Sequence, residues 1–156
     1  MAKNRIKMKV QRVRDVKLPT RGTPQSAGLD FYVPNDYEDR RISPGQSVLI
    51  PSGIRVEVPE GYALIAFNKS GIAVKKQLYV GACVIDEDYQ GEIHIHLTNV
   101  GASYARIYPG DKIAQFILLP ILYSQVEEVD ELHKVPTKRG TGAFGSTDDK
   151  DNLKYC

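Results

Sequence analysis

The sequence predicts an all-β fold, and two observations lead to that prediction. Glycines recur every eight to ten residues between positions 45 and 110, a spacing typical of short antiparallel strands joined by tight turns. Between these turns apolar and polar residues alternate, as in Ile54–Val58 and Ile93–Leu97. A period of two residues indicates a strand with one buried face.

The individual elements follow from the same patterns. Apolar residues at 6, 8 and 10 alternate with lysines, so we expect a strand to begin within residues 1–12. Val48–Ile50 and Ile113–Leu119 are more continuously apolar and are expected to be more fully buried strands. The one helix that we expect is short and lies around Val74–Gln77. Prolines fall at segment ends, where a missing N–H group is harmless.

Length and charge exclude several classes of protein. A chain of 156 residues is enough for one domain with its own core. Its net charge of only +2 argues against a nucleic acid polymer as partner, and no apolar run approaches the roughly 20 residues that span a membrane. There is no secretory signal pattern at the start, and the two cysteines cannot form a disulfide framework. We therefore expect a cytoplasmic protein.

The C-terminal part differs in pattern from the rest. We expect a single all-β domain over residues 1–136, followed by a glycine-rich arm and polar tail over residues 137–156. Gly140–Gly145 fits G-x-G-x-x-G, but the strand, helix and distant acid of a dinucleotide fold are missing, and Ser146 replaces the lysine of a P-loop. What remains is either a floppy C-terminal tail without a binding role or a mobile segment whose backbone N–H groups converge on an anion.

Three further segments carry candidate chemistry. Asp86 follows the apolar run Gly81–Ile85, so it is either a partly desolvated base or part of a solvated hairpin tip. Asn68–Gly71 combines a lysine and a serine in a turn, which is either an anion site or a plain loop. Ala27–Asp30 places a single acid after a glycine.

Taken in order, five segments resemble the motifs of the trimeric deoxyuridine triphosphatases. They are Ala27–Asp30, Asn68–Ala73, Gly81–Gly91, Gly110–Gln115 and Arg139–Thr147. The resemblance extends from about residue 20 to Thr147. It implies an all-β homotrimer of distorted jelly-roll or β-clip barrels, with active sites between subunits and a mobile glycine-rich C-terminal arm.

The resemblance also implies an activity, the hydrolysis of dUTP to dUMP and pyrophosphate with Mg²⁺ on the triphosphate. Such an enzyme limits uracil incorporation into DNA and supplies dUMP for thymidylate synthesis. Asp86 would be the general base that deprotonates the attacking water, and Tyr89 would pack on the deoxyribose and exclude a 2′-hydroxyl. Asp30 would hold the metal indirectly, through water. The implied partners are dUTP and further copies of the chain, and any regulatory protein partner is unknown.

The substrate-binding residues that the resemblance implies form three groups. The backbone that would read uracil is that of Gly81, Ala82, Cys83, Val84 and Ile85. The residues that would hold the α and β phosphates are Lys69, Ser70, Gly71 and Gln115. The arm that would close over the nucleotide contains Arg139, Gly140, Gly142, Phe144, Gly145, Ser146 and Thr147. Within the arm, Phe144 would stack on the uracil ring.

The chain departs from the family pattern at several positions. Lys69 and Lys112 stand where arginine is frequent, Asn68 where proline is usual, and Ala143 where glycine is frequent. Lysine keeps the charge but lacks the bidentate fork of arginine.

Two other functions stay open at this point. A deoxycytidine triphosphate deaminase of related fold is disfavoured because the chain has no tryptophan. A non-catalytic, nucleotide-sensing trimer is disfavoured because the motif residues named above are intact.

Overall fold

The computed structural model describes residues 6–132 and 135–143. It divides the chain into two units, Met1–Leu122 and Tyr123–Cys156. The first unit ends at Leu122, whereas the sequence predicts a folded domain that extends to residue 136. The domain boundary at residue 136 stays a prediction.

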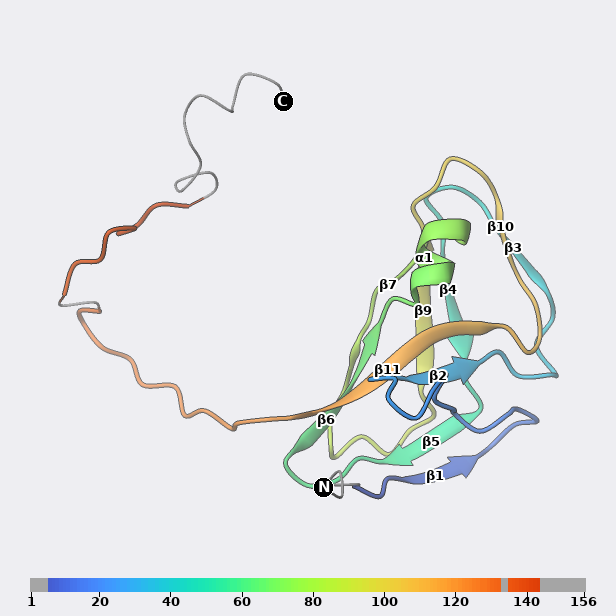
Figure 1. Ribbon diagram of the computed structural model, residues 1–156, viewed down its shortest axis with the longest axis horizontal. Coiled ribbons are helices and arrows are strands. Elements are labelled where there is room, and N and C mark those ends of the chain that lie inside the picture. The colour runs from blue at the N-terminus through green and yellow to red at the C-terminus, as the bar shows by residue number, and fades with distance from the viewer. Residues whose placement is uncertain (1–5, 133–134, 144–156) are drawn as a thin grey trace. The chain divides into compact units, whose positions relative to one another are not determined.

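The all-β prediction is confirmed in the first unit (Figure 1), whose described residues form eleven strands and one short helix. These are β1 (Lys9–Arg12), β2 (Leu29–Tyr32), β3 (Arg40–Ile42), β4 (Ser47–Pro51), β5 (Ile54–Glu57), β6 (Tyr62–Phe67), α1 (Ser70–Lys76), β7 (Leu78–Val80), β8 (Val84–Ile85), β9 (His94–Asn99), β10 (Ala105–Ile107) and β11 (Lys112–Pro120).

All strand pairings among the described residues are antiparallel, and they form four sheets. The orders are β2-β11-β6-β8, β4-β9-β7, β1-β5 and β3-β10. These pairings do not close into a barrel, so the barrel expected from the resemblance is not seen in this part of the chain.

Strand β11 organises the largest sheet because it pairs on both sides. It places Gln115 opposite Asp30 of β2 and, on its other edge, opposite Phe67 of β6. The register with β2 shifts between Lys112 and Ala114. Such a bulge inserts one extra residue and changes the direction of neighbouring side chains.

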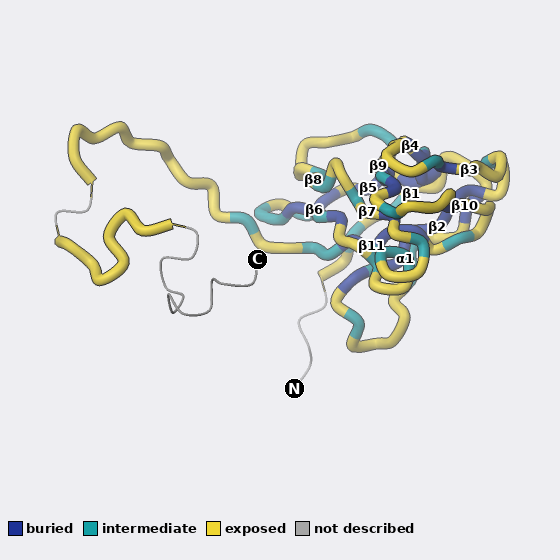
Figure 2. The backbone as a smooth tube through the Cα atoms, turned by 90° about the horizontal axis from the view of Figure 1, so that it is seen from above, coloured by how far each residue is buried: buried dark blue, intermediate teal, exposed yellow. Residues whose placement is uncertain are grey.

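The alternation seen in the sequence is confirmed by burial (Figure 2). The apolar residues of Ile54–Val58 and Ile93–Leu97 are buried and the residues between them are more exposed. The expectation that Val48–Ile50 is buried throughout is wrong at Leu49, which is 56% exposed. Leu49 pairs with His96 on the outer face of the β4-β9-β7 sheet, so its position in the pleat decides its exposure.

The same applies to the expected buried strand Ile113–Leu119. Ile113, Ala114 and Phe116 are buried, but Leu119 near the end of β11 is exposed. Phe116 packs against Phe31 of β2 with ring centroids 4.2 Å apart. The first half of β11 therefore belongs to the core and the second half leaves it.

The helix begins earlier than the sequence predicts. It spans Ser70–Lys76 rather than Val74–Gln77, and Gln77 ends it in the left-handed conformation with φ of 51°. The carbonyl of Lys69 accepts hydrogen bonds from the N–H groups of Ile72 and Ala73, at 2.9 and 2.8 Å. The turn after β6 thus continues directly into the helix.

The described residues of the second unit contain no helix or strand and are all exposed. A turn forms where the N–H of Gly140 bonds the carbonyl of Thr137 and the N–H of Gly142 bonds that of Arg139. Within the described parts of the chain, none of the helices has the length and apolar character needed to cross a bilayer.

Gly53 is the glycine whose replacement tests the packing of the first unit. Its φ is +71°, and a Cβ there would lie 2.8 Å from Cγ1 of the buried Val16 and 2.9 Å from Cβ of Arg14. Gly45 has a similar φ of +75° but open space around it. We expect Gly45→Ala to cost about 1–2 kcal/mol through backbone strain alone. Gly53→Ala should cost about 1–3 kcal/mol more, because it also overpacks the core.

Urea unfolding of both variants at one fixed protein concentration measures this difference. Equal losses of stability in the two variants would contradict the packing described for Val16.

Candidate functional site

A buried carboxylate with two lysines lies at the junction of β2, β11 and the start of α1. Asp30 is only 5% exposed. Its Oδ1 is 2.9 Å from Nζ of Lys69, and its Oδ2 is 3.2 Å from Nζ of Lys112. A carboxylate removed from water is tolerated when it is paired in this way. The three charged groups, which we call the Asp30 cluster, carry a net charge of +1.

Neighbouring groups stabilise the protonated form of Lys112. The hydrogen bond to Asp30, helped by the nearby Tyr32, raises the pKa of Lys112 above its usual value. Burial raises the pKa of the Tyr32 phenol, but its hydrogen bond with Thr20 and the charges of Lys112 and Lys17 outweigh burial and lower that pKa overall. Lys112 is therefore protonated throughout the neutral pH range.

The segment Asn68–Gly71 lies beside this cluster and leads into α1. Lys69 caps the helix in an extended conformation, and Ser70 and Gly71 form its exposed first turn. Backbone N–H groups in a first turn have no acceptor within the helix, so they can bind an anion. The carbonyl of Asn68 accepts a hydrogen bond from Nε2 of Gln115 at 2.9 Å, which brings the amide to the same loop.

Gly28 explains how Gln115 fits. A Cβ at position 28 would lie 2.6 Å from Oε1 of Gln115 and 3.0 Å from its Cβ. The glycine before Asp30 therefore leaves room for the amide on the neighbouring strand. The structure thus brings together Asp30, Lys69, Ser70, Gly71 and Gln115, five of the residues that the sequence singles out.

The segment Gly81–Ile85 runs along the other edge of β6. The carbonyl of Cys83 accepts a hydrogen bond from the N–H of Ala66 at 2.8 Å, and Ile85 pairs with Leu64. The Cys83 thiol donates to the carbonyl of Gly81 at 2.8 Å. Gly81 and Ala82 are exposed, so backbone groups of this segment are accessible to a ligand.

His96 supports the start of that segment. Its carbonyl accepts the N–H of Gly81 at 3.0 Å, and any Cβ on Gly81 would overlap its imidazole ring. Asn68 contributes too, because its Oδ1 accepts the N–H of Val80 at 2.7 Å. The backbone at Val80 and Gly81 is therefore held from both sides.

The proposed base Asp86 lies at the opposite end of β6 from Lys69. Strand β8 runs antiparallel to β6 with Ile85 opposite Leu64, so Asp86 follows in the direction of Ala63. Lys69 is six residues beyond Ala63 along the chain, which corresponds to about 20 Å in extended strand. One copy of the chain does not bring Asp86 to the Asp30 cluster.

Asp86 is also exposed, so its own chain does not provide the partial desolvation that the sequence suggests. Its neighbour Glu87 has a structural contact: Oε2 accepts the N–H of Gly61 at 2.7 Å. Tyr89 is 43% exposed and donates its hydroxyl to the carbonyl of Glu92 at 2.9 Å.

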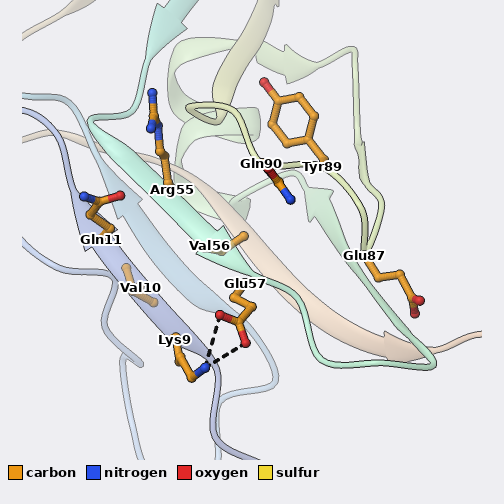
Figure 3. Close-up of a pocket in the computed structure, with 9 residues that line it drawn as sticks. All are labelled: Lys9, Val10, Gln11, Arg55, Val56, Glu57, Glu87, Tyr89 and Gln90. Atoms are coloured by element: carbon orange, nitrogen blue, oxygen red, sulfur yellow. Dashed lines mark hydrogen bonds and ion pairs between the residues drawn. The ribbon is translucent and has the colours of Figure 1, made fainter.

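A cavity of about 420 Å³ lies beside Tyr89 (Figure 3). It is lined by residues of β1, β5 and the loop after β8: Lys9, Val10, Gln11, Arg55, Val56, Glu57, Glu87, Tyr89 and Gln90. Lys9 and Glu57 point toward each other and form an ion pair of 2.9 Å. None of the lining residues belongs to the Asp30 cluster, so this cavity is separate from the phosphate-binding candidates.

The remaining candidate residues belong to the second unit. Arg139, Gly140 and Gly142 lie in its turn, where Nε of Arg139 donates to the carbonyl of Gly142 at 3.1 Å. Phe144, Gly145, Ser146 and Thr147 lie outside the described residues.

Comparison with known proteins identifies the family. The family model described as dUTPase matches residues 14–148. The chain belongs to the dUTPase family. The deoxyuridine 5′-triphosphate nucleotidohydrolase of Mus musculus is 43% identical over 130 residues, which cover 83% of this chain and 76% of that protein. The protein of that name from Desulfitobacterium hafniense is 41% identical over 150 residues, covering 92% and 97%.

Solved dUTPases share the fold. The dUTPase of Staphylococcus bacteriophage 80alpha with dUPNHPP matches with a TM-score of 0.79 at 23% identity, over 90% of this chain and 98% of that one. A mutant dUTPase from phage phi11 of S. aureus, in which a structural Mg(II) ion is coordinated, matches with a TM-score of 0.73 at 22% identity, over 81% and 99%.

The residues of this dUTPase-family chain fit a metal held through water rather than directly. Each oxygen of Asp30 accepts one lysine and keeps a second lone pair for a water molecule. Among the residues that the structure describes, no three His, Cys, Asp or Glu side chains gather as a metal site. Mg²⁺ commonly binds substrate phosphates and retains several waters, which agrees with an indirect role for Asp30.

Sequence reasoning does not predict the contacts that Lys112, Asn68 and His96 make. Asn68 and Lys112 lie in two of the motif segments, but both depart there from the family pattern. Their contacts depend on strand register and on a bulge in β11. Neither feature can be predicted from the alternation of apolar and polar residues along the chain.

Proposed function

We propose that this protein hydrolyses dUTP to dUMP and pyrophosphate. Family membership and relatives named deoxyuridine 5′-triphosphate nucleotidohydrolase support this reaction. The structural observation that supports it most is the arrangement of Lys69, the first turn of α1 and Gln115 around the buried Asp30. This surface offers a positive charge and several N–H donors to one anionic ligand. In a cytoplasmic setting, the reaction would limit uracil in DNA and supply dUMP for thymidylate synthesis.

The active site is composite and combines segments of different copies. Asp86 and Lys69 are about 20 Å apart along β6. At this distance, Asp86 and Lys69 of the same copy cannot both act on the phosphates of one bound nucleotide. A second copy can supply Asp86 and Tyr89 opposite the Asp30 cluster of the first. The assembly is a homotrimer, as the family resemblance implies. Exposed apolar side chains in the second unit, including Val126 and Leu132, agree with a segment that a neighbouring copy covers.

Each group then has a defined task in the reaction. Asp86 accepts a proton from the attacking water, and Lys69, Gln115 and the N–H groups of Ser70 and Gly71 hold and neutralise the phosphates. Mg²⁺ would supply further charge neutralisation on the triphosphate, and Asp30 would hold it indirectly, through water.

Base and sugar are selected by the hairpin segment. Backbone groups of Gly81–Ile85 pair with the N3–H donor and O4 acceptor of uracil, whereas cytosine presents the opposite pattern and leaves these groups unpaired. Tyr89 packs on the deoxyribose and leaves no space for a 2′-hydroxyl. The arm, with Arg139, Gly140, Gly142 and the segment Phe144–Thr147, closes over the bound nucleotide and excludes water.

Turnover of dUTP, dCTP, dTTP and UTP with Mg²⁺ tests the proposed reaction. We expect pyrophosphate release from dUTP and at least about 100-fold lower kcat/KM for the other three. Cytosine reverses the donor and acceptor pattern of uracil, UTP carries a 2′-hydroxyl that Tyr89 excludes, and dTTP carries a 5-methyl group that must be excluded sterically. Comparable hydrolysis of UTP or dCTP would refute the proposal. Ammonia release from dCTP would identify the deaminase instead, and binding without turnover the nucleotide sensor.

Replacement of Asp86 tests the assignment of the base. Asp86→Asn should lower kcat by about 10²–10⁴-fold, since an amide cannot accept the proton of the water. Affinity for a non-hydrolysable imido analogue of dUTP should stay within about threefold. The control is Asp88→Asn, an exposed carboxylate two residues away. If Asp86→Asn retains nearly full kcat while Asp88→Asn does not, the base is assigned to the wrong residue.

A further inference from the structure

The ammonium of Lys69, the cation of the proposed phosphate loop, already has a partner. Its Nζ is 2.9 Å from Oδ1 of Asp30, and the carboxylate is almost fully buried. An isolated lysine–aspartate pair has no net charge. A phosphate approaching such a pair must compete with the carboxylate for the ammonium, and a buried carboxylate left alone is strongly unfavourable. Lys69 and Asp30 by themselves would therefore form a weak phosphate site.

Lys112 changes this balance. Its Nζ is 3.2 Å from Oδ2, the second oxygen of the same carboxylate. The carboxylate is then neutralised by one lysine whether or not Lys69 stays bound. The cluster has one positive charge in excess, and Lys69 can transfer its hydrogen bonds to a phosphate without leaving Asp30 unpaired.

The surroundings keep Lys112 directed at Asp30. Its Nζ lies 5.7 Å from the ring centroid of Tyr32, a cation–π contact. The bulge between Lys112 and Ala114 shifts the pairing by one residue, so that Lys112 rather than Ile113 lies opposite Tyr32. This shift moves Lys112 one position closer to Asp30 along β2.

We propose that Lys112 is a positioning residue, which neutralises Asp30 and thereby releases the ammonium of Lys69 to bind a nucleotide phosphate. This role rests on the proposed function, because it takes the triphosphate of dUTP as the ligand of the phosphate loop. The proposed role of Lys112 requires only a positive charge. A lysine can therefore replace the arginine that is frequent at this position, although it lacks the bidentate fork of arginine.

Binding of the imido analogue of dUTP, measured by calorimetry in EDTA and again with Mg²⁺, tests this role. The EDTA series removes any contribution of Asp30 through metal-bound water. Lys112→Met and Lys112→Gln should each weaken binding about 5- to 30-fold in both series, and Lys112→Arg should stay within about threefold of the wild type. The thermal midpoint of each variant controls for folding.

The double variant Lys112→Met with Asp30→Asn distinguishes positioning from direct contact. Asparagine carries no charge, so Lys69 is again free, and in EDTA the double variant should recover affinity to within about threefold of the wild type. Recovery supports the positioning role. Weakened binding without recovery would mean that Lys112 contacts the phosphate itself, and unchanged binding in Lys112→Met and Lys112→Gln would mean that it has no role. Either result overturns the proposal.

The wild-type protein separates this inference from the proposed function. If the wild-type chain does not bind the analogue at all, the proposed substrate is wrong, and the role of Lys112 falls with it. If the wild type binds and the Lys112 variants bind equally well, only the positioning role is wrong.

Discussion

The pairing of β6 with β11 on one edge and with β8 on the other is the constraint on which the rest of this structure depends. β11 brings Gln115 and Lys112 to Asp30, and the end of β6 delivers Lys69 to the same place. On the opposite edge, β8 directs Asp86 toward the start of β6. Because backbone hydrogen bonds fix both directions, the proposed base Asp86 and the proposed phosphate loop at Lys69 cannot meet within one copy. Assembly is therefore part of the chemistry that we propose.

Charge balance is the second constraint, and it is linked to the first. Asp30 is buried where three segments meet, so its charge must be neutralised for the fold to form. Two lysines do so, one from the loop after β6 and one from β11. A site that binds a highly charged phosphate chain needs more positive charge than is required to neutralise the buried carboxylate of Asp30. The bulge in β11 supplies it by bringing a second lysine within reach of the carboxylate.

Local periodicity was enough to predict the all-β fold and the buried faces of Ile54–Val58 and Ile93–Leu97, since alternation is a property of neighbours in the chain. It failed at Leu49, where a run of apolar residues concealed which face points outward. The ordered motifs identified the loop residues that gather at Asp30. They did not predict the contact of Lys112 with Asp30, which depends on a register shift, or the distance between Asp86 and Lys69, which depends on the direction of β8.

The claim that the site is shared between copies is tested most directly by mixing two inactive variants. Asp86→Asn and Lys69→Ala chains are co-expressed in equal amounts, and mixed oligomers are demonstrated by differential tagging. If each site takes Asp86 from one copy and Lys69 from another, about one quarter of the sites contain both intact residues, and about one quarter of the wild-type dUTPase activity returns. Absence of activity in oligomers shown to be mixed would mean that each copy builds its own site, and would contradict the account.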